Sequence, residues 1–134
     1  MIGKNTKIWD NKGLWGNHKI GSNCKIGKFV EIGDKVVIGD YCKIEAFSFI
    51  CPGVVIGNNV FIGPHVCFTN DKYPRAVNDD FVPCRTIVED DVSIGAGSVI
   101  VCGVTLHKGC MIGAGSVVCK DVPRDTVVKG IWKG

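Results

Sequence analysis

An apolar residue recurs at every sixth position along most of the chain. Glycine directly follows many of these residues, and the fifth residue of each hexapeptide is small or β-branched. A period of six matches neither the period of about 3.6 of a helix nor the period of about 2 of a long strand, which excludes a helical bundle and a simple sandwich. The repeating apolar positions, which we call the column, are Ile2, Ile8, Leu14, Ile20, Ile26, Ile32, Ile38, Ile44, Ile50, Ile56, Ile62 and Phe68, followed after a break by Val88, Ile94, Ile100, Leu106, Ile112 and Val118.

This repeat predicts a β-solenoid. A short strand and a tight turn form one side of a prism, and three six-residue sides close a coil of 18 residues. We expect just under six coils, in which the column residue and the fifth residue of each hexapeptide both point inward. Cys24 and Cys42 are fifth residues one coil apart, so we interpret them as small apolar core residues instead of a redox pair. Val122 is also predicted to be a fifth residue.

Two tryptophans depart from the repeat near the start of the chain. Trp9 and Trp15 stand where glycine is usual. We expect them to cover the open end of the solenoid core, and the alternative is a stacking platform for a base. The outward lysines Lys7, Lys25 and Lys43 lie one coil apart, which favours a solvated face that opposes aggregation over a track for phosphates.

The column breaks once, between Phe68 and Val88. The step there is 20 residues instead of six, so 14 residues are extra. The insertion, at about residues 69–86, is polar and charged and contains two prolines. Solenoids commonly carry functional residues on loops that leave between coils, so we predict an ordered functional loop.

The I-G-x-x-V-x repeat resembles the left-handed parallel β-helix of the hexapeptide transferases, which implies one all-β domain over residues 1–134 with a single inserted loop. Residues 68–75, F-T-N-D-K-Y-P-R, resemble the F-T-N-D-x-x-P-R segment of the sugar-nucleotide 3-N-acetyltransferases. That resemblance implies transfer of acetyl from acetyl-CoA to the 3-amino group of a nucleotide-linked sugar, for cell-surface polysaccharide synthesis. The expected acceptor is of the dTDP-3-amino-3,6-dideoxyhexose or UDP-2-acetamido-3-amino-glucuronate type. It also implies a homotrimer with acetyl-CoA in the groove between prisms, and apolar outward stripes such as Val99 with Val117 agree with buried contact.

The resemblance implies specific site residues in and near the loop. Asn70 and Asp71 are expected to approach the substrate amine, and Tyr73 and Arg75 to contact the substrate. Galactoside and maltose O-acetyltransferases have their catalytic His where this chain has Tyr73, which counts against a hydroxyl acceptor. A sugar amine is partly neutral at pH 7 and mostly needs orienting, whereas a hydroxyl needs a general base. His65 is the alternative general base, at an outward place of its hexapeptide.

Small residues further along the chain predict the acetyl-CoA site. Two Ile-Gly-Ala-Gly-Ser steps begin at Ile94 and Ile112, one coil apart, and leave room for a pantetheine arm beside the backbone. By resemblance we expect Lys120 near a CoA phosphate. The predicted cofactor-binding residues are Ala96, Gly97, Ala114, Gly115, Cys119 and Lys120.

Composition and charge exclude several other classes. A formal net charge of +3 from 16 basic and 13 acidic residues is too small for a dedicated nucleic-acid binder. No apolar run approaches the roughly 18 residues of a membrane span, and the first residues lack a signal-peptide core, so we expect a cytoplasmic protein with reduced cysteines. His18, His65 and His107 offer no close pair, so we expect no metal. The alternatives left open are sugar O-acetylation and a non-catalytic β-helix scaffold.

Overall fold

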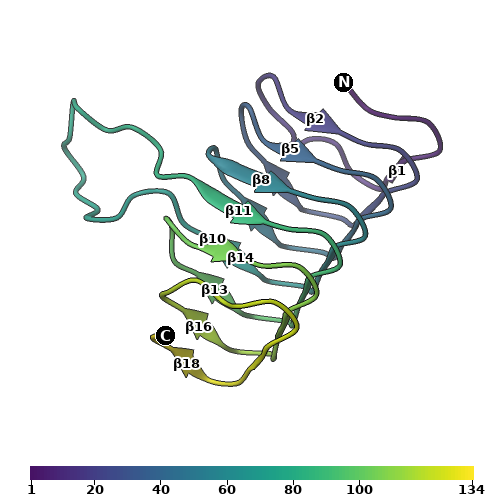
Figure 1. Ribbon diagram of the computed structural model, residues 1–134. Coiled ribbons are helices and arrows are strands. Elements are labelled where there is room, and N and C mark those ends of the chain that lie inside the picture. Colours follow the sequence, from purple (N-terminus) through teal and green to yellow (C-terminus); the bar gives the residue numbers. More distant parts are fainter.

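The computed structural model describes all of residues 1–134 and consists of stacked coils whose short strands form three parallel sheets (Figure 1). Sheet A contains β2 (Lys19–Ile20), β5 (Val37–Ile38), β8 (Val54–Ile56), β11 (Thr86–Val88) and β14 (Thr105–Leu106). Sheet B contains β1 (Lys7–Ile8), β3 (Lys25–Ile26), β6 (Lys43–Ile44), β9 (Phe61–Ile62), β12 (Ser93–Ile94), β15 (Met111–Ile112) and β17 (Val127–Val128). Sheet C contains β4 (Glu31–Ile32), β7 (Phe49–Ile50), β10 (Cys67–Phe68), β13 (Val99–Ile100), β16 (Val117–Val118) and β18 (Ile131–Trp132).

The pairing register confirms the predicted β-solenoid. Ile26 pairs with Ile44, and Ile44 with Ile62, so equivalent hexapeptides of successive coils lie side by side. The column from Ile20 onward is buried, as are the fifth residues from Cys24 onward, and together they form one continuous core. Both sets therefore point inward as predicted.

No helix in the structure is long and apolar enough to cross a bilayer.

The predicted number of coils was too small, because the repeat changes spacing after Val118. Val122 lies only four residues after Val118, and it pairs with Leu106. It is therefore a column residue instead of the predicted fifth residue. Val128 and Trp132 then continue the stacks of Ile112 and Val118. Two turns, each shortened by two residues, hide this last coil from a search at period six, and sheet B contains seven strands.

Some of the small polar side chains in the core find a hydrogen-bond partner in the next coil. Ser48 Oγ donates to the Gly63 carbonyl at 2.8 Å, and Cys24 Sγ donates to the Gly39 carbonyl at 3.2 Å. Both bonds join a fifth residue to the glycine 15 residues later. The Ser48 hydroxyl and the Cys24 thiol are therefore satisfied, which removes most of the cost of their burial.

The tryptophans do not cover the end of the core, so that expectation was wrong. Trp9 and Trp15 are each 46% exposed, and it is Ile8 and Leu14 that pack against the buried cluster. Each ring lies on the outside of the prism, because the place that follows a column residue points away from the core. The predicted lysine row is present, since Lys7, Lys25 and Lys43 are paired neighbours.

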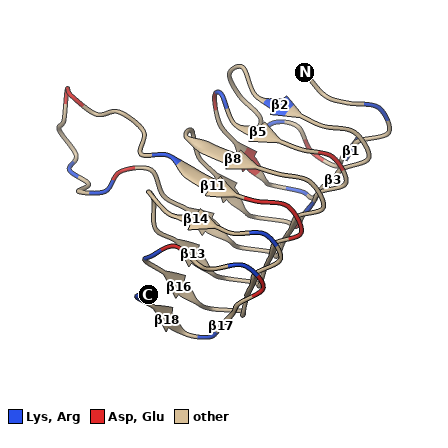
Figure 2. Cartoon of the chain, in the orientation of Figure 1, with Lys and Arg blue, Asp and Glu red and all other residues tan.

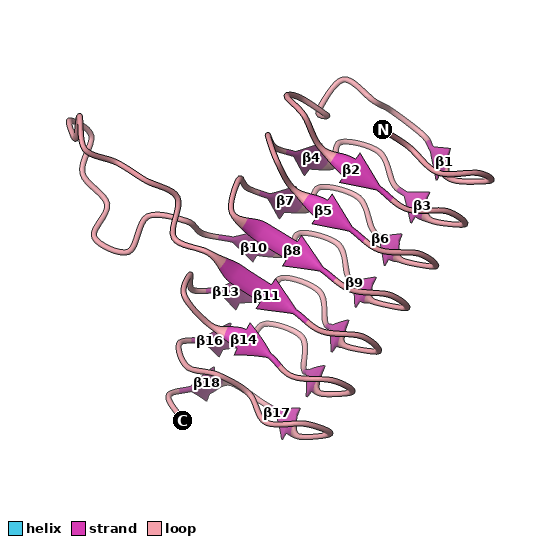
Figure 3. Ribbon diagram, turned by 45° about the horizontal axis from the view of Figure 1, so that its top comes forward, coloured by secondary structure: helices cyan, strands magenta, loops and turns pink.

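The three long edges of the prism are built differently. We name each edge by the two sheets that it joins. The A–B edge carries a ladder in which Asp40 Oδ1 accepts from the Ser22 N–H at 2.8 Å, Asn58 Oδ1 from the Asp40 N–H at 2.8 Å and Asp90 Oδ1 from the Asn58 N–H at 2.7 Å. Figure 3 shows that the insertion projects from the C–A edge, between β10 and β11. It carries residues of both charges (Figure 2).

Candidate functional site

Backbone hydrogen bonds close the neck of the inserted loop where it leaves the C–A edge. The Cys84 N–H donates to the Asn70 carbonyl at 2.7 Å, which joins the two ends of the loop. The Gly103 N–H donates to the Arg85 carbonyl at 3.0 Å and ties the returning strand to the next coil. The loop itself, residues 69–85, contains no strand or helix. Its neck is therefore fixed relative to the prism.

Asn70 is held in one orientation by the preceding coil. Its Nδ2 donates to the Pro52 carbonyl at 3.0 Å, and its side chain is partly buried. An amide that donates through nitrogen presents its carbonyl oxygen elsewhere, so Oδ1 is oriented as an acceptor. The approach of Asn70 to a substrate amine stays a prediction.

The loop encloses a hollow of about 280 Å³. Three of the predicted residues, Asp71, Tyr73 and Arg75, lie together in its wall, whereas Asn70 is outside the lining. Opposite charges in one small hollow suit a polar ligand with both donors and acceptors. The full lining is Asp71, Lys72, Tyr73, Arg75, Asn78, Asp80, Phe81, Val82 and Cys84.

A larger cavity of about 490 Å³ lies at the same edge, beside the foot of the loop. It brings the predicted residues Cys119 and Lys120 together with Lys72 of the loop and Lys133 of the last residues. Three lysines against the single carboxylate of Asp121 make the cavity positive, which suits a phosphate. Sequence reasoning missed Lys133, because the coil that carries it breaks the period of six.

Cys102 lines this cavity but is a poor nucleophile. The residue is only 5% exposed, and burial raises the pKa of its thiol above the usual value. The reactive form of cysteine is the thiolate, so Cys102 remains protonated near neutral pH. Cys102 is therefore a poor candidate for a covalent nucleophile.

The other predicted residues lie at the B–C edge. His65 occupies a left-handed turn with φ of 59°, and its ring stacks on Phe47 at 4.9 Å between centroids with 6° between planes. Phe47 stacks in turn on Phe29 at 5.0 Å. Gly97 and Gly115 continue this row in the next two coils, and nothing lies within 4 Å of where their Cβ atoms would be. Ala96 and Ala114 are exposed beside them.

This row carries no side chain in the two coils that follow His65. Backbone bonds hold both turns, since the Gly97 N–H donates to the Pro64 carbonyl at 2.9 Å and the Gly115 N–H to the Ala96 carbonyl at 2.8 Å. The absence of side chains at both glycines leaves this backbone exposed.

The structure therefore divides the predicted site between the two edges of sheet C. Asn70, Asp71, Tyr73, Arg75, Cys119 and Lys120 belong to the C–A edge, and His65, Ala96, Gly97, Ala114 and Gly115 to the B–C edge. Within one chain the width of sheet C separates the two groups. Its outward residues between the edges form a continuous apolar stripe, in which Phe49 neighbours Cys67, Cys67 neighbours Val99, and Val99 neighbours Val117.

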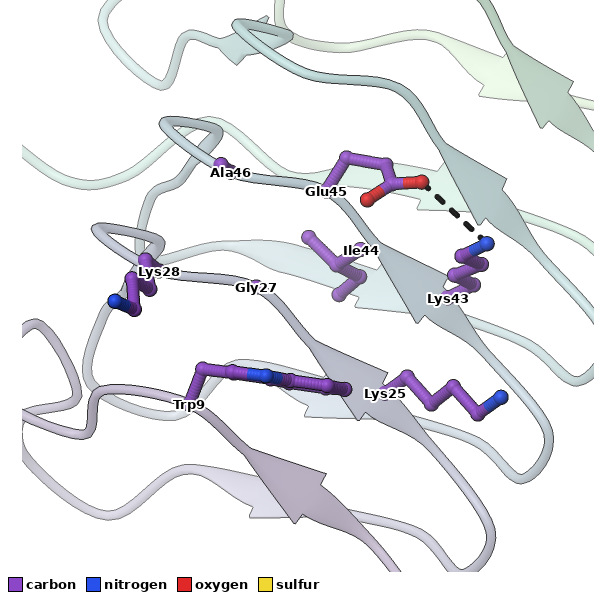
Figure 4. A pocket seen from close by; sticks show the side chains of 8 residues that line it. All are labelled: Trp9, Lys25, Gly27, Lys28, Lys43, Ile44, Glu45 and Ala46. Atoms are coloured by element: carbon purple, nitrogen blue, oxygen red, sulfur yellow. Dashed lines mark ion pairs between the residues drawn. The ribbon is translucent and has the colours of Figure 1, made fainter.

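A third cavity, of about 280 Å³, lies on sheet B close to the B–C edge, in the first coils (Figure 4). We call it the Trp9 slot. Its lining is Trp9, Lys25, Gly27, Lys28, Lys43, Ile44, Glu45 and Ala46. Sequence reasoning missed this cavity, and the signal that could have found it is the order of tryptophan, glycine and glutamate after successive sheet B strands. The structure shows no group of three or more His, Cys, Asp or Glu placed to hold a metal ion.

Curated relatives share parts of this sequence. A 2,3,4,5-tetrahydropyridine-2,6-dicarboxylate N-acetyltransferase from Staphylococcus aureus is 39% identical over 74 residues, which are 55% of this chain and 28% of that protein. A galactoside O-acetyltransferase from Lactococcus lactis is 34% identical over 83 residues, 58% of this chain and 39% of that protein. The chain thus spans well under half the length of these relatives.

A solved structure shares the fold over nearly the whole chain. A mutant of AntD, an N-acyltransferase from Bacillus cereus crystallised with dTDP and coenzyme A, superposes with a TM-score of 0.80. It is 24% identical in sequence, and the match covers 94% of this chain and 77% of that one. The family model described as bacterial transferase hexapeptide (six repeats) matches residues 17–51, 35–70 and 85–120. These ranges take in more than half of the chain, which therefore belongs to the hexapeptide-repeat family of bacterial transferases.

Proposed function

We propose that this protein transfers acetyl from acetyl-CoA to the 3-amino group of a nucleotide-linked amino sugar used in cell-surface polysaccharide synthesis. The acceptor would be of the dTDP-3-amino-3,6-dideoxyhexose or UDP-2-acetamido-3-amino-glucuronate type. The observation that carries the proposal is the fixed amide of Asn70, whose Nδ2 is bound to the Pro52 carbonyl and whose Oδ1 is left to accept. An acceptor oxygen at the mouth of a loop suits an amine, which has protons to donate.

The proposed chemistry needs orientation more than proton removal. Asn70 Oδ1 accepts an N–H of the neutral amine, Asp71 helps to hold the substrate, and the amine nitrogen attacks the thioester carbonyl. The new C–N bond forms as the C–S bond breaks. The departing CoA thiolate takes the surplus proton from nitrogen, which leaves an amide and a free thiol.

The donor would lie along the edges of sheet C. Ala96, Gly97, Ala114 and Gly115 would offer open backbone to the pantetheine arm, because nothing lies within 4 Å of where Cβ atoms on the two glycines would be. Lys120, Lys72 and Lys133 surround the cavity at the other edge and would bind CoA phosphates.

A homotrimer would complete the site. One subunit supplies the small residues of its B–C edge, and its neighbour supplies the loop and the lysines of its C–A edge. The apolar stripe of Phe49, Cys67, Val99 and Val117 lies between these edges and suits burial against a neighbouring prism. Sedimentation equilibrium should give three times the mass of the 14.4 kDa chain.

The test is release of free thiol from acetyl-CoA with a panel of dTDP- and UDP-linked 3-amino sugars, with galactosides as hydroxyl controls. We expect turnover with an amino sugar only, and we expect Asn70→Ala to lower kcat/KM at least about tenfold. Asn58→Ala is the matched control, because it also removes an asparagine hydrogen bond to a neighbouring coil, at the distant A–B edge. An unchanged rate in Asn70→Ala would remove this residue from the mechanism.

The two remaining outcomes separate the alternatives. Turnover with galactosides alone would indicate O-acetylation with His65 as the general base. No thiol release from any acceptor would favour the non-catalytic scaffold.

A further inference from the structure

The Trp9 slot is a flat-sided opening between two coils that are not adjacent. Trp9, Gly27 and Glu45 occupy the same place after β1, β3 and β6, so their backbones stack in successive coils. Gly27 has no side chain, and the space beside it lies between the indole ring of Trp9 and the Glu45 side chain (Figure 4). Because strands stack at about 4.8 Å, a planar group lying on the indole would occupy the level of Gly27.

The charges around the slot are predominantly positive. Lys25 and Lys28 line it, and Lys43 pairs with Glu45 at 3.6 Å, which leaves Glu45 already compensated. The Lys7 ammonium, which does not line the slot, lies over the Trp9 ring at 4.5 Å from its centroid and adds a further positive charge there. An aromatic wall surrounded by excess lysine suits a ligand with a planar ring and an attached anion.

The other exposed tryptophan shows that this arrangement is not a general property of the open end. Trp15 has the same 46% exposure, but its Nε1 donates to the Glu31 carboxylate at 3.2 Å. A carboxylate at the ring repels an anion, and Trp15 lines none of the cavities described above. Of these two tryptophans, only Trp9 lines a cavity that also contains lysines.

The slot is also in the right place for one end of the proposed acceptor. It lies at the same edge as His65, and Trp9 is three strand spacings, or roughly 14 Å, below the coil of Gly63 in sheet B. The residues expected to hold the donor, Ala96 and Ala114, lie in later coils on the other side of His65. An acceptor that reaches the thioester from the side opposite the donor has its distant end toward the first coils.

We infer that the Trp9 slot binds the nucleoside diphosphate portion of the acceptor, with the base stacked on Trp9 and the diphosphate near Lys25 and Lys28. This inference rests on the proposed function for the identity of the acceptor. The stacking contact itself depends only on the slot, so it can be measured without any turnover.

The first experiment is isothermal titration of the 134-residue chain with UDP, dTDP, ADP, CoA and inorganic pyrophosphate. We expect UDP or dTDP to bind at least about tenfold more tightly than pyrophosphate, and Trp9→Ala to remove that difference. Trp15→Ala is the matched control and should change affinity less than about twofold. Equal affinities for UDP and pyrophosphate, or equal effects of the two substitutions, would overturn the inference.

Two further measurements identify which ligand uses the slot. Lys25→Gln should weaken UDP and pyrophosphate alike, whereas Trp9→Ala should affect only the nucleotides. If CoA and ADP, but not UDP or dTDP, lose affinity in Trp9→Ala, the slot belongs to the donor and our assignment is wrong. With an active acceptor in hand, Trp9→Ala should raise the KM for the nucleotide sugar about tenfold and leave kcat and the KM for acetyl-CoA unchanged. If no acceptor is acetylated, the proposed function fails while the titrations still decide the slot.

Discussion

Gly95 and Gly97 lie two residues apart in one turn of the B–C edge, and each needs glycine for a different reason. A Cβ atom on Gly95 would lie 2.5 Å from the backbone nitrogen of Ala114 and 2.8 Å from its Cα. A Cβ atom on Gly97 would meet nothing within 4 Å, and only a φ of +70° opposes a side chain there. His65, at the equivalent place one coil earlier, has a φ of 59°. We therefore predict that Gly95→Ala is much more destabilising than Gly97→Ala.

The expected magnitudes follow from these contacts. Ordinary contact begins at 3.4 Å, so Gly95→Ala must move two backbones apart by about 0.9 Å and stretch the 2.7 Å bond from the Gly95 N–H to the Ile112 carbonyl. Overpacking and one weakened hydrogen bond together cost roughly 3 kcal/mol. For Gly97→Ala, a left-handed penalty of about 1–2 kcal/mol is partly offset by the smaller entropy of the unfolded chain, which leaves about 1 kcal/mol.

The measurement is urea denaturation of both variants, followed by far-UV circular dichroism at one protein concentration. We expect the free energies of unfolding to differ by about 2 kcal/mol, with Gly97→Ala the more stable variant. Equal losses, or a larger loss for Gly97→Ala, would refute the argument that contact between coils is what requires glycine after a column residue.

Two other predictions concern buried polar groups. Thr86 is fully buried and its Oγ1 has no hydrogen-bond partner, so Thr86→Val should leave the free energy of unfolding unchanged or raise it by about 1 kcal/mol. Ser48→Ala removes a satisfied hydroxyl and should lower the free energy of unfolding in the same urea titration. Burial raises the pKa of the Cys110 thiol from 9.0 to about 11, so the folded state favours the protonated form. That contribution is complete below pH 9 and is lost as the pH rises through 11, a change of roughly 3 kcal/mol. Denaturation at a series of pH values should show a shallower alkaline loss in Cys110→Val, and identical pH profiles would contradict the assignment.

The regular part of the fold could be predicted because the same hexapeptide pattern occurs many times along the chain. Each column residue from Ile20 to Phe68 points inward, so one ambiguous hexapeptide does not change the predicted register of the repeat. Val122 was misplaced because one turn is shorter by two residues, and no local signal in the sequence marks that deletion. Lys133 was missed for the same reason, since its place depends on the shifted coil.

The arrangement of the site was harder to predict than its members. Asn70 and Ala96 were both chosen from short motifs, but a motif does not say which edge of the prism carries it. The edge is found by counting hexapeptides along the chain, and the inserted loop interrupts that count. Trp9 was misread because the open end of the core is closed by Ile8 and Leu14, which leaves the indole outside.

The stacking of coils fixes distances along the edges of the prism. Neighbouring strands differ by a constant rise of about 4.8 Å, so the distance along an edge from Trp9 to His65 can change only in whole steps. Removing or duplicating 18 residues, the separation of paired strands such as Lys25 and Lys43, would shorten or lengthen that distance by one step and leave every turn intact. The number of coils between two contacts is an integer, and it sets the length of ligand that fits along the edge. Substitution of side chains alone cannot change that length.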